Sequence, residues 1–316
     1  MAIKKPAITV IIVSYKCPEP LKETLSSVMA QRYEGPVETV VVDNASRDET
    51  PEIVKRFPNV KLIESRENLG FARANNLGAR EGEGDFLFIL NPDVVLPPGL
   101  LSRLADYLTD DPRVGAVGPT LIEKTGRLQK YCAWKNYTTA AAIADVIGLS
   151  EGLPRRFLRA GCFYPHDLYY GEPKEVFSLS GSCALIRKEA FLAAGGFDER
   201  YFLFGEDLDL FRTIRRKGFR VVYLPSEPVV HMTGASMASF NPVVRIAGIE
   251  SPILYNQKYR GAITGLMLMA AAYFSASARL AFFSFGAALR PEETAASRRA
   301  RYYQKVIEIL SRKKFW

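Results

Sequence analysis

Short runs of β-branched and other apolar residues recur along the first 120 residues and alternate with amphipathic stretches. Five runs predict strands, at residues 8–13, 37–42, 60–63, 86–90 and 114–117. Between them, apolar positions three and four apart, such as Leu21, Leu25 and Val28, predict helices. The helices are expected at residues 21–28, 51–57, 72–80 and 98–108. This alternation is typical of an α/β fold with a mostly parallel central sheet flanked by helices.

The pattern weakens after residue 120 and returns near residue 176. Residues 120–175 are rich in aromatic and alanine residues and predict no definite element. Two short strands are expected around Gly181, and a helix over residues 206–217 that Gly218 would end. Further strands are predicted at residues 220–224 and 229–230.

The C-terminal part has a different character. Residues 262–278 carry no formal charge, and apolar residues resume after Arg279 as far as Leu289. Seventeen residues is the lower limit for a helix that spans a bilayer, so a helix lying in the membrane interface is favoured. A spanning helix, a subdomain packed on the core and an oligomer contact remain as alternatives. We therefore predict a catalytic domain at 1–240 and a helical, membrane-associating region at 241–316.

Composition and charge narrow the partners. The 316 residues carry a formal net charge of +8, which favours anionic partners. Basic runs at 298–301 and 312–314 flank the apolar stretch, a pattern more typical of a membrane surface than of nucleic-acid binding. Four scattered cysteines without a CxxC pair indicate a reducing compartment. These features predict a peripheral protein on the cytoplasmic face of a membrane, and they leave its oligomeric state open.

Acidic residues stand where two predicted strands end. Asp43 ends the second strand, and Asn91, Pro92 and Asp93 follow the fourth. In parallel sheets, ligands bind at the carboxyl ends of the strands. A carboxylate there is costly to bury unless a cation or several hydrogen-bond donors meet it. Asp93 is therefore interpreted as a ligand of a phosphate-binding metal ion, and a simple turn is the alternative.

Five motifs, taken in this order, resemble the inverting glycosyltransferases of family 2, which have the GT-A fold. They are VIIVSY (10–15), VVVDNAS (40–46), NLGFARAN (68–75), NPD (91–93) and GEDLDL (205–210). The resemblance covers about residues 7–235. It implies a nucleotide-binding half at about 1–120 and an acceptor-binding half at about 120–240. The NPD form is most similar to bacterial rhamnosyltransferases that use dTDP-rhamnose.

The resemblance implies a set of donor-binding residues. They are Val13, Ser14, Tyr15, Asp43, Asn68, Gly70, Arg73, Asn75 and Asn91. In the family, the acid at Asp43 accepts a hydrogen bond from the pyrimidine N3–H, and the residue at Asn91 faces the ribose. An Asx turn of Asp43 with Asn44 is the alternative. Arg73 is a candidate phosphate or sugar contact, although a helix-capping Asn68 and a solvated Arg73 would explain that segment equally.

The remaining site residues are candidate ligands of a metal ion and a candidate general base. The resemblance implies that Asp93 and His231 hold Mg²⁺ or Mn²⁺, with a structural histidine as the alternative. Transfer with inversion also needs a base that deprotonates the acceptor hydroxyl. Asp207 of the Glu206–Asp207 pair has this role in the family. Acids are also favoured at a helix N-terminus by the helix dipole, which is the alternative for this pair.

The predicted activity is therefore transfer of one sugar, L-rhamnose from dTDP-rhamnose, to a hydroxyl of a cell-surface glycan or polyprenyl-linked acceptor in cell-wall or polysaccharide biosynthesis. A UDP-sugar-dependent enzyme of the same fold and a catalytically silent nucleotide- or carbohydrate-binding scaffold are the alternatives. A dehydrogenase is disfavoured because no G-x-G-x-x-G follows the first strand. A processive synthase is disfavoured because the chain lacks a Q-x-x-R-W motif.

Overall fold

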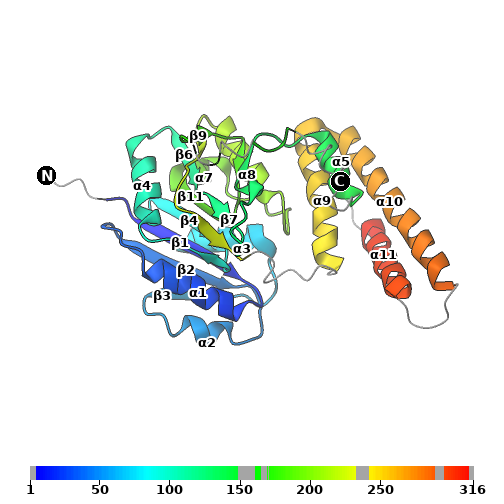
Figure 1. Cartoon of the computed structure of the whole chain (residues 1–316), viewed down its shortest axis with the longest axis horizontal. Coiled ribbons are helices and arrows are strands. Elements are labelled where there is room, and N and C mark those ends of the chain that lie inside the picture. The colour runs from blue at the N-terminus through cyan, green and yellow to red at the C-terminus, as the bar shows by residue number, and fades with distance from the viewer. Residues whose placement is uncertain are drawn as a thin grey trace. The chain divides into compact units, whose positions relative to one another are not determined.

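The computed structural model describes residues 5–148, 161–164, 169, 171–232, 242–288 and 295–312. The chain divides into two compact units, and Figure 1 labels their main elements. The first comprises Met1–Asn136, Phe163–Phe202 and Glu206–Ser236, and the second comprises Tyr137–Cys162, Leu203–Gly205 and Met237–Trp316. The boundary near residue 240 and the division into donor and acceptor halves stay predictions.

The first unit is built on an eight-stranded sheet. In spatial order the strands are β3 (Val60–Glu64), β2 (Val37–Asp43), β1 (Ile8–Ser14), β4 (Phe86–Leu90), β11 (Cys183–Arg187), β6 (Val114–Gly118), β12 (Arg220–Tyr223) and β9 (Lys174–Glu175). Every residue of β1, β4 and β6 is buried, which agrees with their continuous apolar runs. The mostly parallel sheet predicted from the alternation is confirmed.

Two strands oppose the common direction. β11 is inserted between β4 and β6 and is antiparallel to both, and β9 is antiparallel to β12. The register pairs Cys183 with Leu90 at the carboxyl end of β4. The sequence predicted a strand here but not its direction, because a fully buried strand has the same apolar pattern in either orientation.

Six helices of the first unit lie within the described residues. They are α1 (Pro18–Met29), α2 (Thr50–Val54), α3 (Gly70–Glu81), α4 (Leu100–Asp110), α7 (Lys188–Ala194) and α8 (Glu206–Arg216). All but α7 were predicted from periodicity. Leu21, Leu25 and Val28 are buried on the inner face of α1, as the pattern required. A proline at the first position of α1 starts the helix three residues before the predicted range.

Short pieces of sheet and helix complete this unit, and none was predicted individually except β10 and β13. They are β5 (Val94–Val95), β7 (Leu121–Ile122), β8 (Ala133–Trp134), β10 (Ser178–Leu179), β13 (Val229–His231) and a 3₁₀ turn (Lys130–Cys132). β13 lies between β5 and β7, and β10 pairs with β8. Two-residue strands carry too little pattern to be read from sequence, because their pairing depends on the surrounding fold.

The second unit is helical. Its elements are α5 (Thr139–Val146), α9 (Pro242–Arg260), α10 (Ala262–Ala288) and α11 (Ala295–Arg312). Arg279, the charge that interrupts the apolar run, is engaged inside this unit. Its guanidinium donates to the carbonyl of Gly148 at 2.8 Å and lies 5.7 Å from the ring centre of Tyr303.

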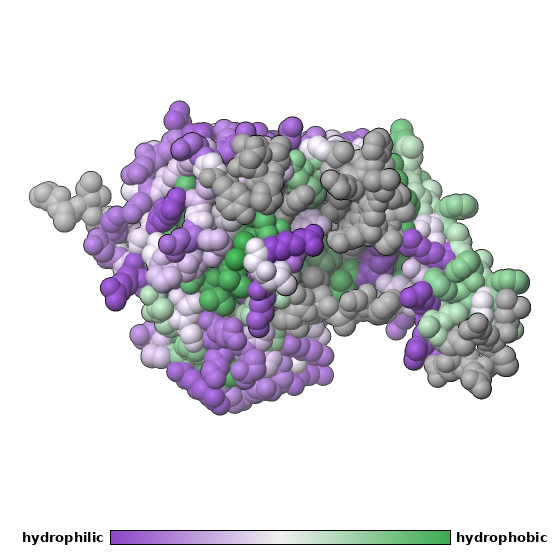
Figure 2. Space-filling model, viewed as in Figure 1, coloured by the Kyte–Doolittle hydropathy of each residue, from purple (hydrophilic) through white to green (hydrophobic). Residues whose placement is uncertain are grey.

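α10 has two contrasting faces. Gly265, Leu268, Ala272 and Ala276 are buried, so this face of mostly small residues packs within the unit. The opposite face exposes large apolar side chains, and Figure 2 shows the apolar surface they form. They are Ile263, Leu266, Met267, Tyr273, Phe274, Phe282 and Phe285. Within the described residues, only α10 is long and apolar enough to cross a bilayer. Leu289, the predicted end of the apolar run, lies outside those residues.

Candidate active site

The loops that follow β1 and β2 lie next to each other at one edge of the sheet. Ser14 and Asp43 are direct register partners at the carboxyl ends of these strands, and both side chains are buried. Among the described residues, Lys16, Ala45 and Arg47 have positive φ angles of 54°, 62° and 56° although none is glycine. Such strained backbone is maintained only where the surroundings enforce it, and it is common at ligand sites.

The Asp43 carboxylate also holds its own loop. Its Oδ1 accepts a hydrogen bond from the Ser46 amide at 3.2 Å, and the Ser46 hydroxyl in turn accepts from the Lys16 amide at 3.0 Å. The turn considered as the alternative is thus present, with Ser46 as its partner in place of Asn44. Oδ1 is occupied by this turn, so the structure gives the Asp43 carboxylate a structural role. Its base-binding role stays a prediction.

Asn44 is a residue that the sequence analysis did not select. Its side-chain oxygen accepts from the Leu69 amide at 2.7 Å, and its amide nitrogen donates to Asn68 at 3.0 Å. Asn68 Oδ1 also accepts from the Gly70 amide at 2.9 Å. Asn68 therefore closes a turn just before α3, whose N-cap is Leu69 and has no side-chain cap, and these two asparagines fix the loop that enters the helix.

Gly70 lies against the protein's own backbone, and its implied contact with the donor stays a prediction. Its φ is +76°, and a Cβ at this position would clash with the carbonyl oxygen of Phe202. That carbonyl accepts from the Phe71 amide at 2.8 Å. Glycine is therefore required here by backbone packing.

Arg73 and Asn75 are on α3 and differ in environment. The Arg73 side chain is 49% exposed, and its ion-pair contacts with Glu67 and Glu199 are long, 3.9 Å each. Both contacts are longer than a hydrogen bond, so an anion would compete with them for the guanidinium. Asn75 is buried and donates to the Phe71 carbonyl at 2.9 Å, and its Oδ1 meets no hydrogen-bond partner among the described residues. A buried oxygen of this kind lacks a hydrogen-bond partner that most buried polar groups have.

The NPD segment forms a tight turn between β4 and β5. Thr24 of α1 secures it, because its hydroxyl donates to the Pro92 carbonyl at 2.9 Å and accepts from the Val94 amide at 3.1 Å. β13 pairs with β5, and the Met232 amide donates to the Asp93 carbonyl at 2.9 Å. The end of β13 is thereby fixed beside this turn.

This pairing brings together the two predicted metal ligands. Nε2 of His231 lies 3.2 Å from Oδ1 of Asp93, and both side chains are nearly buried. Asn91 reaches the same nitrogen through Nδ2 at 3.4 Å, and Asn91 Oδ1 has no partner among the described residues. Gln129, which the sequence analysis missed, contacts the other ring nitrogen at 3.0 Å. No cluster of three or more His, Cys, Asp or Glu residues occurs in the described part of the chain.

The acidic pair begins α8. Asp207 Oδ2 accepts from the Gly181 amide at 3.2 Å, and Oδ1 accepts from the Leu208 amide at 2.7 Å. Burial raises the pKa of Asp207 above its ordinary value. Burial, followed by the neighbouring charge of Asp207, raises the pKa of Glu206 further, and Glu206 Oε2 has no partner among the described residues. A carboxyl group with a raised pKa can accept a proton near neutral pH.

Residues 9–193, more than half of the chain, match the model of glycosyl transferase family 2. The chain belongs to this family. Two proteins of Mycobacterium tuberculosis strains, both named N-acetylglucosaminyl-diphospho-decaprenol L-rhamnosyltransferase, are similar to this glycosyltransferase. Each is 35% identical over 245 residues, covering 70% of this chain and 75% of its own length. The O-antigen biosynthesis protein RfbC of Myxococcus xanthus is 27% identical over 238 residues, covering 73% of this chain and 18% of RfbC.

Two solved structures share the glycosyltransferase's fold. A mannosyltransferase of Pyrobaculum calidifontis, in complex with GDP-Man and Mn²⁺, has a TM-score of 0.54 at 19% identity, covering 100% of this chain and 88% of its own. GalNAc-T7, with UDP, GalNAc and Mn²⁺, has a TM-score of 0.58 at 15% identity, covering 98% of this chain and 56% of its own. The predicted GT-A fold is confirmed.

The family match ends before α8. Asp207 and His231 therefore lie C-terminal to the matched residues, and their assignments rest on the contacts described above. All predicted site residues fall within the described part of the glycosyltransferase, and their individual roles stay proposals.

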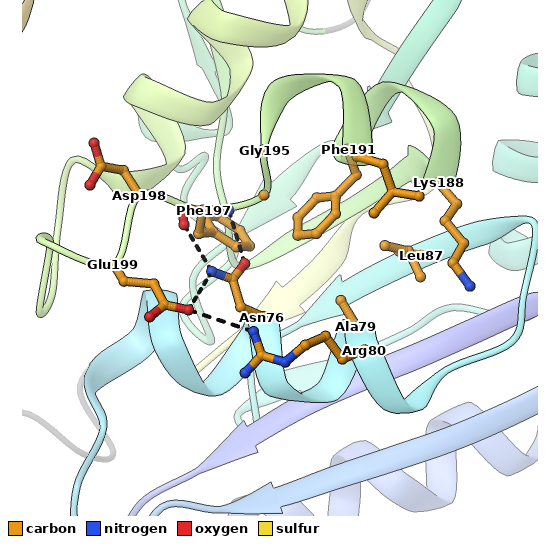
Figure 3. A pocket seen from close by; sticks show the side chains of 12 residues that line it. Asn76, Ala79, Arg80, Leu87, Lys188, Phe191, Gly195, Phe197, Asp198 and Glu199 are labelled. Atoms are coloured by element: carbon orange, nitrogen blue, oxygen red, sulfur yellow. Dashed lines mark hydrogen bonds and ion pairs between the residues drawn. The ribbon is translucent and has the colours of Figure 1, made fainter.

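A separate hollow of about 570 Å³ lies beside α3 and α7 (Figure 3). Asn76 lines this hollow, and its side-chain amide donates to the Phe197 carbonyl at 2.8 Å and to Glu199 at 3.1 Å. Asn76 Oδ1 accepts from the Phe197 amide at 2.9 Å. These bonds join α3 to the segment after α7, so the polar groups of Asn76 serve the fold.

Replacement of Glu206 by glutamine tests its protonation. Because the folded state holds a proton that the unfolded chain releases above the ordinary pKa of 4.5, wild-type stability should fall as the pH rises from 4.5 toward the folded-state pKa. Glu206→Gln lacks this ionisation, so its stability relative to wild type should be greater at pH 8 than at pH 5. Urea unfolding across this range measures the difference. Glu189→Gln, an exposed position on α7, is the matched control, and equal pH dependence of the two variants would contradict the prediction.

Proposed function

We propose that this glycosyltransferase transfers L-rhamnose from dTDP-rhamnose, with inversion, to N-acetylglucosamine carried on a polyprenyl diphosphate. The observation that carries this proposal is the 35% identity to the mycobacterial enzymes named for rhamnosyl transfer to such an acceptor. The NPD form of the turn after β4 supports the same donor.

The donor would bind along the carboxyl ends of β1, β2 and β4. Asp43, with Val13, Ser14 and Tyr15, is proposed to bind the base, and Asn91 the ribose. The unpartnered oxygens of Asn91 and Asn75 support this placement, because sugar hydroxyl groups can donate to them. Arg73 is proposed to move toward the diphosphate or the rhamnose.

Mg²⁺ or Mn²⁺ fits the pair formed by Asp93 and His231. Two ligand atoms, each about 2.0–2.2 Å from one ion and roughly at a right angle, lie about 3 Å apart. The observed separation of 3.2 Å matches this distance. Two protein ligands suit an ion that completes its coordination with water and substrate phosphates. When bound, the ion would neutralise charge on the leaving diphosphate.

Asp207 is proposed as the base. It would take the proton of the acceptor hydroxyl as that oxygen bonds to the anomeric carbon and the bond to the dTDP oxygen breaks. Its two backbone hydrogen bonds fix the carboxylate in place, and its raised pKa favours proton acceptance.

The test is a transfer assay with a synthetic N-acetylglucosaminyl-diphospho-polyprenol and Mn²⁺. dTDP-rhamnose, UDP-glucose and UDP-N-acetylglucosamine are supplied separately, and mass spectrometry identifies the product. We expect addition of one deoxyhexose from dTDP-rhamnose. Addition of a hexose from a UDP-sugar would establish the UDP-dependent alternative. Nucleotide binding without any transfer or donor hydrolysis would favour the silent scaffold.

We also propose that the exposed apolar face of α10 binds the cytoplasmic membrane surface where this acceptor resides. Phe274 is 78% exposed and Phe282 is 72% exposed, and both are on that face. Arg298, Arg301 and Lys305 are exposed on the adjoining helix α11, which packs against α10. An apolar face next to basic residues is complementary to an anionic bilayer surface. The packed opposite face of α10 favours a position in the interface over a span.

Substitution on α10 should release the protein from anionic vesicles. Phe274→Asp with Phe282→Asp removes the apolar contact, so co-sedimentation should be lost at low salt. Leu192→Asp, at a position 64% exposed on α7, is the matched control and should bind normally. Arg298→Ala with Arg301→Ala and Lys305→Ala should weaken binding by about 1 kcal/mol per residue. Absence of wild-type binding at low salt would contradict the proposal, and a smaller oligomer in the α10 variant would favour the oligomer contact.

A further inference from the structure

Gln129 holds one residue, His231, by two hydrogen bonds. Its side-chain Nε2 donates to the His231 carbonyl at 3.1 Å, and its Oε1 lies 3.0 Å from the imidazole Nδ1. Gln129 is buried, and its backbone amide donates to the Leu121 carbonyl at 2.9 Å. Both ends of its carboxamide are therefore engaged at a fixed distance from the histidine.

The chemistry of these groups determines which way the amide points. A backbone carbonyl can only accept a hydrogen bond, so the amide nitrogen of Gln129 must face the His231 carbonyl. The amide oxygen then faces Nδ1, and an oxygen can only accept. In a neutral imidazole, Nδ1 must therefore carry the proton, and Nε2 carries the lone pair.

We propose that Gln129 is a positioning residue that fixes the Nδ1–H tautomer of His231 and so directs the Nε2 lone pair toward Asp93. Nε2 and Asp93 Oδ1, 3.2 Å apart, are then two acceptors with no proton between them. The weak contact from Asn91 at 3.4 Å does not satisfy both. A cation relieves this repulsion. The metal consequence rests on the proposed function, whereas the tautomer follows from Gln129 alone.

The alternative tautomer would have the opposite effect. With the proton on Nε2, the imidazole would donate a charge-assisted hydrogen bond to Asp93, and a metal ion would have to displace that proton. In the neutral ring, Gln129 thus prevents the two ligands from bonding to each other.

The first experiment reads the tautomer without metal. The chain has two histidines, so the protein labelled with ¹⁵N-histidine gives an Nδ1 and an Nε2 signal from each of two imidazoles, and His166→Gln identifies those of His231. At a pH where the ring is neutral, we expect wild type to have Nδ1–H. Gln129→Met should convert His231 to Nε2–H, and Gln129→Glu should keep Nδ1–H because its carboxylate still accepts. Gln31→Met also removes a glutamine that bonds to backbone carbonyls, those of Ser27 and Pro97, and should change nothing.

The second experiment titrates Mn²⁺ in the presence of dTDP and follows free ion by electron paramagnetic resonance. Gln129→Met should weaken Mn²⁺ binding about 10–100-fold, the usual effect of removing a partner of a metal-bound histidine. Gln129→Glu should remain within a few-fold of wild type. An Nε2–H signal in wild type, or an unchanged tautomer in Gln129→Met, would overturn the inference. Should no variant bind Mn²⁺ while the tautomer changes as expected, the inference stands and the proposed metal site fails.

If Gln129→Met does not fold, the wild-type signal and Gln129→Glu still decide. Loss of Nδ1–H in the folded Gln129→Glu variant would show that an acceptor at this position does not control the ring.

Discussion

Asp207→Asn is expected to lower the turnover of sugar transfer about 10²–10⁴-fold, the usual contribution of a general base. Asparagine has nearly the same shape but cannot take the proton from the acceptor hydroxyl. It keeps one acceptor for the amides of Gly181 and Leu208 and loses the other, so stability should fall by about 1 kcal/mol. Release of nucleotide diphosphate under saturating substrates measures turnover.

Donor affinity separates this role from a structural one. Calorimetry with the donor and Mn²⁺ should give similar affinity for Asp207→Asn and wild type. The isosteric change Glu206→Gln provides the comparison, since it alters the neighbouring acid without removing Asp207. If Asp207→Asn kept wild-type turnover and Glu206→Gln showed the large loss, Glu206 would be assigned as the general base instead.

Asp93→Asn should abolish the dependence of donor binding on Mn²⁺, with at least about 100-fold weaker affinity for the donor in the presence of metal. The amide has no charge with which to hold the ion, whereas the turn keeps both its hydrogen bonds with Thr24. Calorimetry with and without Mn²⁺ measures the effect.

A surface acid provides the control for Asp93. Asp106, whose side chain is 48% exposed and pairs with Lys5, can be changed to asparagine with no expected effect on donor binding. Unchanged metal dependence in Asp93→Asn, with the fold verified by circular dichroism, would remove Asp93 from the metal site.

The parts that sequence predicted are those with a long repeating pattern. The strand ending at Ser14 is buried throughout, the strand ending at Asp43 is buried from Thr39 onward, and α1 repeats its apolar residues along one face. The order of such elements places their carboxyl ends at one edge, which is why the acids at these ends could be selected.

The parts that sequence did not predict depend on contacts between distant segments. Gln129 is a single polar residue outside any periodic run, and only the pairing of β13 with β5 and β7 brings His231 to it. Gly70 was correctly selected as a special glycine, but its partner proved to be Phe202, because a sequence shows the conformational demand and not the neighbour that creates it.

β11 has a consequence for the range of sugars that this enzyme can transfer. At its start, the Ser182 carbonyl accepts from the Asn91 amide at 2.8 Å, and one residue earlier the Gly181 amide donates to Asp207. Consecutive residues of a single peptide segment thus join the NPD turn to the carboxylate of α8 through main-chain groups. The distance between the NPD turn and the Asp207 carboxylate is therefore set by main-chain groups, and side-chain substitutions should leave it unchanged. We expect exchanges of one monosaccharide for another to require changes only in the side chains lining the space between the two, whereas inserting a residue between Ser180 and Cys183 should uncouple them.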